Sequence, residues 1–297
     1  MHVLQELLGP VPVREFFDKH FTRVPFAMPD QATLYTQDFS DADFAAMAED
    51  SRAMLRIVRD GRLVHDRARL SWAEAQAYYQ GGHTLLVRHA ERASAKLQAL
   101  AEAFVQVFHA PVDIQVYLTP DQSQAFGWHY DLEEVFIIQV QGCKEYTVRQ
   151  NTLNPWPVWD NLPAEMRYDR ETSRVRLTCR LEAGDWLYIP SGWWHIAETQ
   201  TASIHLSVGV MPVVALHLFA FLQHRLAQDP FWCQRLTWVA QAVAGRPAPA
   251  EHVRQHWQAM RAQLQQVLAQ EQTCQQFLAY LVDPTRARSL ERPADDL

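Results

Sequence analysis

The chain has 297 residues, of which 48% are hydrophobic and 21% are charged, and its formal net charge is −7 at pH 7. This composition excludes a disordered, collagen-like or low-complexity protein. Because the overall charge is negative, no global cationic field favours phosphate backbones, and we expect no DNA partner. The length allows one large domain with an appendage, or two modest domains.

The N-terminus and the cysteines bear on where the protein works. The first 17 residues contain no basic segment followed by an apolar one, so we expect no signal peptide. No apolar run is long enough to cross a bilayer, so we expect no membrane association. No two cysteines form a C-x-x-C pair; the four are Cys143, Cys179, Cys233 and Cys274. These features indicate a cytoplasmic protein with reduced thiols.

The N-terminal part of the chain is predicted to mix helices and strands. Ser40 and Ser71 are expected helix N-caps, because Asp43 and Glu74 follow three residues later, the second completing a capping box. The predicted elements through residue 108 are helices at 13–20, 38–50, 71–80 and 94–108, a hairpin at 54–64 around Asp60-Gly61, and a strand at 84–88.

From residue 113 the hydrophobic pattern changes to short strands separated by Gly and Pro. The six predicted strands are 113–118, 134–141, 145–149, 175–180, 186–189 and 203–210. Many short strands at this spacing are typical of a β-sandwich or barrel. Three helices are expected beyond Pro212, at 216–227, 231–243 and 251–281.

These patterns predict four parts of the chain, with the main boundary near residue 212. They are an α/β extension that packs on the barrel (1–79), the β-rich domain (80–212), a helical region (213–282) and a flexible tail (283–297).

Three residues of the β-rich part have the pattern of a metal site. His129 and Asp131 are two positions apart, so on a strand both side chains point to the same side. His195 ends the phrase Gly184-Asp-Trp-Leu-Tyr-Ile-Pro-Ser-Gly-Trp-Trp-His. Two imidazoles and one carboxylate form the facial triad of a non-haem Fe(II) oxygenase, which leaves three coordination positions open. We therefore predict that these three residues bind a metal.

The same segments resemble the JmjC group of Fe(II)- and 2-oxoglutarate-dependent oxygenases, and within it the bacterial cupin-like ribosomal oxygenases. The similarity lies in 112–120, 122–124, 129–131, 134–146, 184–195 and 203–209, within a match over about residues 80–212. It implies a mainly β fold with α elements, a double-stranded β-helix of the cupin or jelly-roll type. It also implies Fe(II), 2-oxoglutarate and O2, with hydroxylation of a C–H bond and release of succinate and CO2.

The resemblance also assigns residues to the cosubstrate. Lys144 stands where the family places a cation that pairs with the distal carboxylate of 2-oxoglutarate, and Tyr117 matches a tyrosine whose hydroxyl reaches the same carboxylate. Gln115, two residues before Tyr117, is expected to line the pocket. His205 and Ser207 belong to a strand whose polar residues alternate with apolar ones, and we expect both near the iron and cosubstrate.

The substrate is the least determined feature. Trp128, Gln139 and Trp193 are candidates for a substrate groove. A protein or peptide side chain is the preferred substrate, with a small molecule or a modified tRNA base as alternatives. Two other functions stay open: a cupin-type metalloenzyme without 2-oxoglutarate, and a non-catalytic JmjC-like scaffold. The sequence does not separate hydroxylation from demethylation, nor does it show whether RNA or a ribosome is bound.

The helical region after residue 212 is predicted to be a dimerisation element, which makes a homodimer the expected assembly. Ribosomal oxygenases continue through such a region into a winged-helix domain. Only about 85 residues follow Pro212 here, and they show no clear winged-helix strands. This departure puts hydroxylation of a ribosomal protein in doubt.

Overall fold

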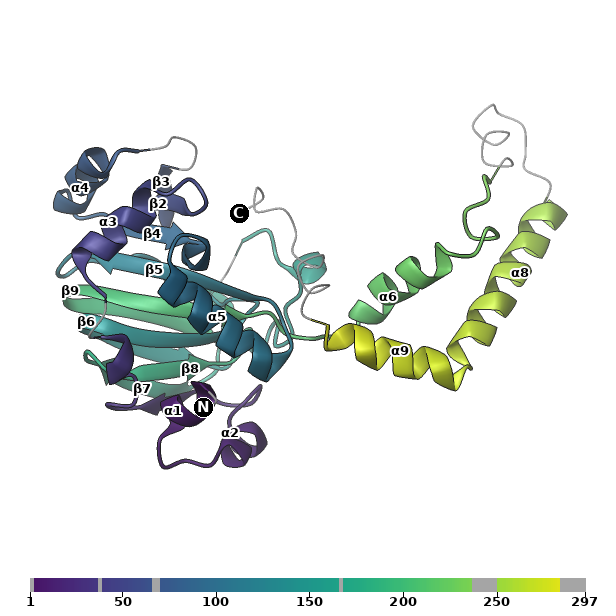
Figure 1. Cartoon of the computed structure of the whole chain (residues 1–297), viewed down its shortest axis with the longest axis horizontal. Helices are drawn as coiled ribbons and strands as arrows, with labels where there is room; N and C mark the ends of the chain where they lie inside the picture. Colours follow the sequence, from purple (N-terminus) through teal and green to yellow (C-terminus); the bar gives the residue numbers. More distant parts are fainter. Residues whose placement is uncertain (1–2, 37–38, 66–69, 166–167, 237–249, 284–297) are drawn as a thin grey trace. The chain divides into compact units, whose positions relative to one another are not determined.

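A computed structural model describes residues 3–36, 39–65, 70–165, 168–236 and 250–283. The chain divides into two compact units, residues 1–212 and 213–297. Figure 1 shows the strands gathered in the first unit and the helices that make up the second.

The first half of unit 1 begins with helices and short strands. Its helices are α1 (Val3–Leu8), α2 (Val13–Lys19), α3 (Asp41–Glu49), α4 (Trp72–Gln80) and α5 (Ala95–Phe108), with 3-10 turns at Thr33–Tyr35 and Ala90–Arg92. Its strands are β1 (Phe26–Met28), β2 (Met54–Arg59), β3 (Arg62–His65) and β4 (Thr84–Arg88). The capping box at Ser71 and Glu74 is confirmed, and Ser40 caps α3 by the same reciprocal bonds with Asp43.

The second half of unit 1 supplies the long strands of the sheet. They are β5 (Val112–Thr119), β6 (Glu134–Arg149), β7 (Val175–Leu181), β8 (Trp186–Ile189) and β9 (Trp194–Val210), with 3-10 turns at Trp159–Asn161 and Tyr168–Arg170. The strand order is β1-β8-β6-β9-β5-β4-β2-β3, and β7 also pairs with β6. All pairings are antiparallel.

Strands β6 and β9 pair with each other along almost their whole length and run through both layers of the fold. The first half of β6 is flanked by β8, whereas its second half is flanked by β7. The two halves meet where the register shifts, between Gln139 and Lys144. This is the predicted double-stranded β-helix, or jelly roll, with a helical region after it.

Alternating residues of β6 enter two different cores, as a strand with both faces covered requires. Phe136 and Ile138 point outward into the core that contains the helices, where the Phe136 ring contacts Phe104 of α5. Val135 and Ile137 point inward and join the apolar interior between the two layers. The inward face of the long strands is therefore where a ligand pocket can form.

Two strand predictions were wrong at their boundaries. Residues 134–141 and 145–149 form one strand, because Gly142 makes an irregularity within β6 instead of a turn. Strand β9 begins at Trp194, nine residues before the predicted start at 203. The Pro/Gly phrase before it suggested a loop, but pairing with the second half of β6 extends the strand to include His195.

Gly142 gives a stability prediction. Its φ is +70°, and an added Cβ would lie 2.1 Å from the carbonyl oxygen of Ala202. We expect Gly142→Ala to lower the free energy of unfolding by about 2–4 kcal/mol, because neither backbone can yield within the sheet. Gly82→Ala is the control, since φ is +83° there but no atom lies within 4 Å. It should cost only about 1 kcal/mol of backbone strain. Urea denaturation of both variants tests this, and equal losses would contradict the steric explanation.

Unit 2 contains α6 (His217–Leu226), α8 (Ala250–Leu268) and α9 (Glu271–Leu281). The single helix predicted at 251–281 is two helices, because the chain turns at Gln270, which has an extended backbone. The turn lets Phe277 and Tyr280 of α9 pack on Phe221 of α6. Of the helix predicted at 231–243, residues 231–236 are not helical and the rest lies outside the described residues, as does nearly all of the predicted tail. No helix in the described ranges is long and apolar enough to cross a membrane.

Candidate metal centre and cosubstrate pocket

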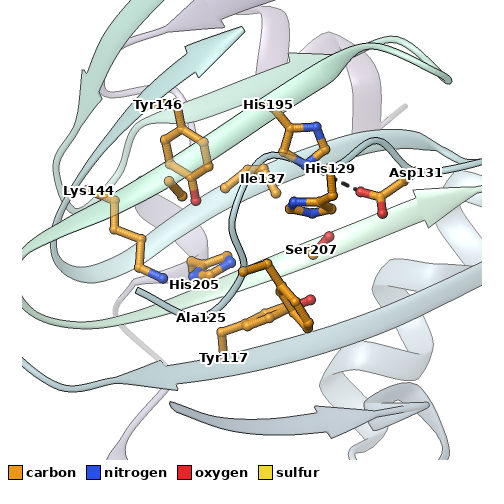
Figure 2. A pocket seen from close by; sticks show the side chains of 12 residues that line it. Tyr117, Ala125, His129, Asp131, Ile137, Lys144, Tyr146, His195, His205 and Ser207 are labelled. Carbon is orange, nitrogen blue, oxygen red and sulfur yellow. Dashed lines mark ion pairs between the residues drawn. The ribbon is translucent and has the colours of Figure 1, made fainter. Parts of the chain in front are cut away.

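His129, Asp131 and His195 come together at one end of the inward face. The two histidines are held by reciprocal backbone hydrogen bonds, from His195 N to His129 O (2.8 Å) and from His129 N to His195 O (3.2 Å). His195 Nε2 lies 3.4 Å from Asp131 Oδ2. One ligand atom of each residue lies within 4.8 Å of the other two, and Figure 2 shows the three side chains facing one another.

In both histidines the imidazole Nδ1 contacts a backbone carbonyl, which leaves Nε2 for a metal. His129 Nδ1 lies 2.8 Å from the carbonyl oxygen of Gly127, and His195 Nδ1 lies 3.0 Å from that of Trp193. A carbonyl oxygen can only accept, so each Nδ1 is the protonated donor and each Nε2 keeps its lone pair. Burial, together with the neighbouring His129, lowers the pKa of His195 to about 4. Its imidazole is therefore neutral at pH 7, as metal ligation requires. The donor set fits Fe(II).

Lys144 lies at the other end of the same pocket (Figure 2). Its side chain is buried, and its Nζ donates a 3.0 Å hydrogen bond to Thr119 Oγ1. Within the described ranges it pairs with no carboxylate, and burial lowers its pKa to about 7. A buried ammonium without a counter-ion is costly, so this end of the pocket is built for an anion.

Two buried polar atoms of the same pocket have no hydrogen-bond partner. They are the hydroxyl oxygen of Tyr146 and Nδ1 of His205. Both residues line the pocket, and the His205 ring stacks on Tyr117 with centroids 4.5 Å apart. Burial, with a smaller effect of the Lys144 charge, lowers the pKa of His205 well below its usual value. A neutral imidazole and a phenol both suit a bound carboxylate, because each can donate a hydrogen bond to it.

Tyr117 lines the pocket, and its hydroxyl hydrogen-bonds to a neighbouring side chain of the same strand. The Gln115 amide donates to Asp113 Oδ2 (3.3 Å), so its Oε1 faces Tyr117 and accepts from the hydroxyl at 2.9 Å. Burial raises the pKa of Tyr117, so the hydroxyl keeps its proton. With its proton directed at Gln115, the hydroxyl oxygen keeps lone pairs that can accept a hydrogen bond. Gln115 supports Tyr117, whereas Ser207 lines the pocket itself.

The three candidate groove residues are placed differently from one another. Gln139 is fully buried and donates to the backbone carbonyls of Gln141 and Ile204, and so it does not contact a groove. Trp193 is also buried, within the apolar interior. Trp128 stacks on Tyr168, with ring centroids 4.0 Å apart. Of the three, only Trp128 remains a candidate for the rim of the site.

The sequence did not single out Tyr146, which lines the pocket, or Thr119, which accepts the hydrogen bond of Lys144. A signal was present, because Tyr146 is two positions after Lys144 and shares its face of β6. Thr119 has the same relation to Tyr117 on β5. Its contact with Lys144 depends on how the strands fold over one another, which periodicity does not specify.

Comparison with known proteins agrees with the fold and the site. Residues 86–218 match the JmjC domain family. The protein is 26% identical over 228 residues to the bifunctional lysine-specific demethylase and histidyl-hydroxylase NO66 of Drosophila persimilis. This match covers 69% of the chain and 31% of the relative. The protein is also 26% identical to ribosomal oxygenase 2 of Bos taurus, in a match that covers 68% of the chain and 46% of the relative. The chain thus spans less than half the length of these relatives.

A solved structure has the same fold. The ribosomal oxygenase YcfD of Escherichia coli, in complex with cobalt and 2-oxoglutarate, superimposes with a TM-score of 0.64 at 18% sequence identity. The match covers 92% of this chain and 71% of YcfD. It extends beyond the JmjC domain, so the likeness in fold includes more than the barrel.

Proposed function

We propose that this protein is an Fe(II)- and 2-oxoglutarate-dependent oxygenase that hydroxylates a C–H bond. The observation that carries the proposal is one pocket with a triad of metal ligands at one end and a buried, unpaired lysine at the other. A five-carbon diacid matches this arrangement, because one end can chelate a metal and the other needs a cation. A metalloenzyme without 2-oxoglutarate would leave Lys144 buried without a function.

Each pocket residue has a part in this proposal. His129, Asp131 and His195 hold the metal, which supplies oxidation by O2 coupled to decarboxylation of the cosubstrate. Lys144 binds the distal carboxylate, and Thr119 holds the ammonium in place. The cosubstrate contacts that we propose, beyond Lys144, are Tyr146, His205 and Ser207. The apolar interior around Ile137 excludes water from this end of the pocket.

We infer that the substrate is a protein or peptide side chain that carries an N–H group. The Tyr117 oxygen and the Asp131 carboxylate line the same pocket and can both accept hydrogen bonds, which favours a substrate group that donates one. The relatives include a histidyl-hydroxylase and ribosomal oxygenases, whose names are consistent with this class. A basic protein also suits the net charge of −7.

The experiment that tests the proposal is succinate release from 2-oxoglutarate and Fe(II), followed by mass spectrometry of proteins from a cell extract treated with the enzyme. We expect succinate and a product with one added oxygen atom. Loss of a methyl group instead would show demethylation. No succinate with any extract, from protein that retains its metal, would contradict the proposal and favour the scaffold alternative.

A variant of Tyr117 distinguishes a contact with the protein substrate from a contact with 2-oxoglutarate. We expect Tyr117→Phe to raise the KM for the protein substrate about tenfold and to leave the KM for 2-oxoglutarate unchanged, because the lost acceptor faces the substrate. Steady-state kinetics with each substrate varied in turn checks this. The opposite pattern, with only the 2-oxoglutarate KM raised, would restore the role that the family resemblance implies.

We also propose that the helical unit makes the protein a homodimer and that it acts in the cytoplasm. Large apolar side chains remain exposed on or beside the helices of unit 2: Leu216, Phe219, Trp257, Leu268, Leu278 and Val282. All four cysteines are free, as in a reducing compartment. Phe219→Glu should convert a dimer to a monomer in light scattering. A wild-type monomer would contradict this assembly.

A further inference from the structure

A second group of metal-binding side chains lies outside the pocket, at the start of β5. His89 follows β4, Glu91 lies in the 3-10 turn Ala90–Arg92, and Asp113 is the second residue of β5. One ligand atom from each lies within 4.8 Å of the other two. Their side chains are only 13–19% exposed, so the group is not an ordinary surface cluster. From this geometry we propose a second, structural site for a divalent first-row transition ion at His89, Glu91 and Asp113.

The hydrogen bonds around the cluster leave one atom of each residue facing its centre. Glu91 Oε2 accepts from Ile114 N at 3.1 Å, and Asp113 Oδ2 accepts from the Gln115 amide at 3.3 Å. Outer partners of this kind orient carboxylates that bind metals. The remaining oxygens, Asp113 Oδ1 and Glu91 Oε1, lie 2.7 and 3.9 Å from His89 Nδ1.

Asp113 Oδ1 gives a second, independent observation at this cluster. The atom is buried and accepts no hydrogen bond of normal geometry, although His89 Nδ1 is only 2.7 Å away. An imidazole nitrogen and a carboxylate oxygen at this distance, outside normal hydrogen-bond geometry, are placed so that both can bind one cation.

The charges of the cluster agree with a divalent ion. Burial raises the pKa of Glu91, and the charge of Asp113 raises it further. Burial would also raise the pKa of Asp113, but His89 and Arg88 hold it below its usual value. Arg92 Nε lies 3.4 Å from Glu91 Oε1, but the Arg92 side chain is about half exposed. A cation between the carboxylates would relieve their repulsion more fully than Arg92 does.

The donor set selects the kind of ion. One imidazole and two carboxylates suit Zn(II), Mn(II), Co(II) or Fe(II), whereas Mg(II) and Ca(II) prefer sites made of oxygen alone. The ion would fasten the connection after β4 to the start of β5. From there the bonds of Asp113 to Gln115 and of Gln115 to Tyr117 lead to the pocket.

Cobalt titration followed by calorimetry tests the site. Metal-free wild type should bind about two ions per chain. Glu91→Gln should bind one ion tightly, and its affinity for the second ion should fall by about 10–100-fold or more. Glu102→Gln, an exposed substitution on α5, is the control and should behave as wild type. The double variant His129→Ala with Asp131→Ala removes the first site and should still bind one ion.

The double variant makes the outcome independent of the proposed enzymatic function. If it binds no cobalt, or if Glu91→Gln still binds two ions, the second site does not exist and the cluster is an ion-pair network. His89→Gln, a substitution of similar polarity, should give the same result as Glu91→Gln. Circular dichroism confirms that each variant is folded before titration.

Discussion

Replacing Asp131 with alanine should abolish coupled and uncoupled turnover of 2-oxoglutarate, with a loss of at least about 1000-fold. Asp131 is the only carboxylate of the triad, and its charge balances a divalent ion that two neutral imidazoles bind alone only weakly. Loss of the metal removes several kcal/mol of transition-state stabilisation, which corresponds to this factor. Succinate formation and metal content, measured on the same preparation, check the prediction.

Asp121→Ala provides the matched control for this variant. Asp121 is an exposed aspartate of the segment that precedes His129, and its side chain is not among the pocket residues. Its removal should change turnover less than about twofold. Asp131→Ala with wild-type turnover, or with wild-type iron content and no turnover, would show that the triad does not hold the catalytic metal.

Replacing Lys144 with methionine should raise the KM for 2-oxoglutarate at least about 100-fold and at the same time stabilise the fold. A carboxylate that loses its buried cationic partner costs about 3–5 kcal/mol. Methionine has a similar length and removes a charge that is buried without a counter-ion. The free energy of unfolding of the ligand-free protein at pH 7 should therefore rise by a few kcal/mol. An unchanged KM would show that the cosubstrate does not use Lys144.

The stabilisation of the ligand-free protein by Lys144→Met should depend on pH, in a direction that the pKa of Lys144 determines. Burial lowers the pKa of Lys144 from 10.5 to about 7, so the folded protein pays for charging it in full below pH 7. This cost shrinks between pH 7 and 10.5, because the folded protein holds Lys144 neutral there and removing the proton that the unfolded chain still carries becomes easier as the pH rises. The stability advantage of Lys144→Met should therefore be largest below pH 7 and shrink as the pH rises. Denaturation at several pH values measures it.

The affinity for 2-oxoglutarate should depend on the same proton. Above pH 7 the empty pocket holds a growing fraction of neutral Lys144, which must take up a proton before it can pair with the carboxylate. The dissociation constant should therefore rise by up to about tenfold per pH unit above 7. Calorimetric titration between pH 6.5 and 9 tests this, and Lys144→Met should show no such slope.

The sequence alone predicted the positions of those residues that depend only on the local pattern. His129 and Asp131 share a face because they are two residues apart, and Ile204 and Leu206 alternate with Ser203 and His205 as predicted. The capping boxes could be read from residue type and spacing alone. The jelly-roll topology came from the family resemblance, since strand periodicity is the same in a sandwich and in a barrel.

Features that depend on tertiary pairing could not be predicted. Gly142 has the appearance of a turn residue, but continuous pairing with β9 carries the strand through it. Gln139 alternates with buried residues and looked available for a ligand, yet its amide hydrogen-bonds with the backbone where the strands shift register. The two-residue spacing places Asp113, Gln115 and Tyr117 on one face of β5, but it does not specify which hydrogen bonds they make and so does not give the direction of the Tyr117 hydroxyl.

Anomalous diffraction from a crystal grown with manganese and 2-oxoglutarate would test the central proposal most directly. We expect a manganese ion bound by His129, Asp131 and His195, with the distal carboxylate of 2-oxoglutarate on Lys144. A pocket with no manganese on the triad, or with 2-oxoglutarate bound away from Lys144, would contradict it.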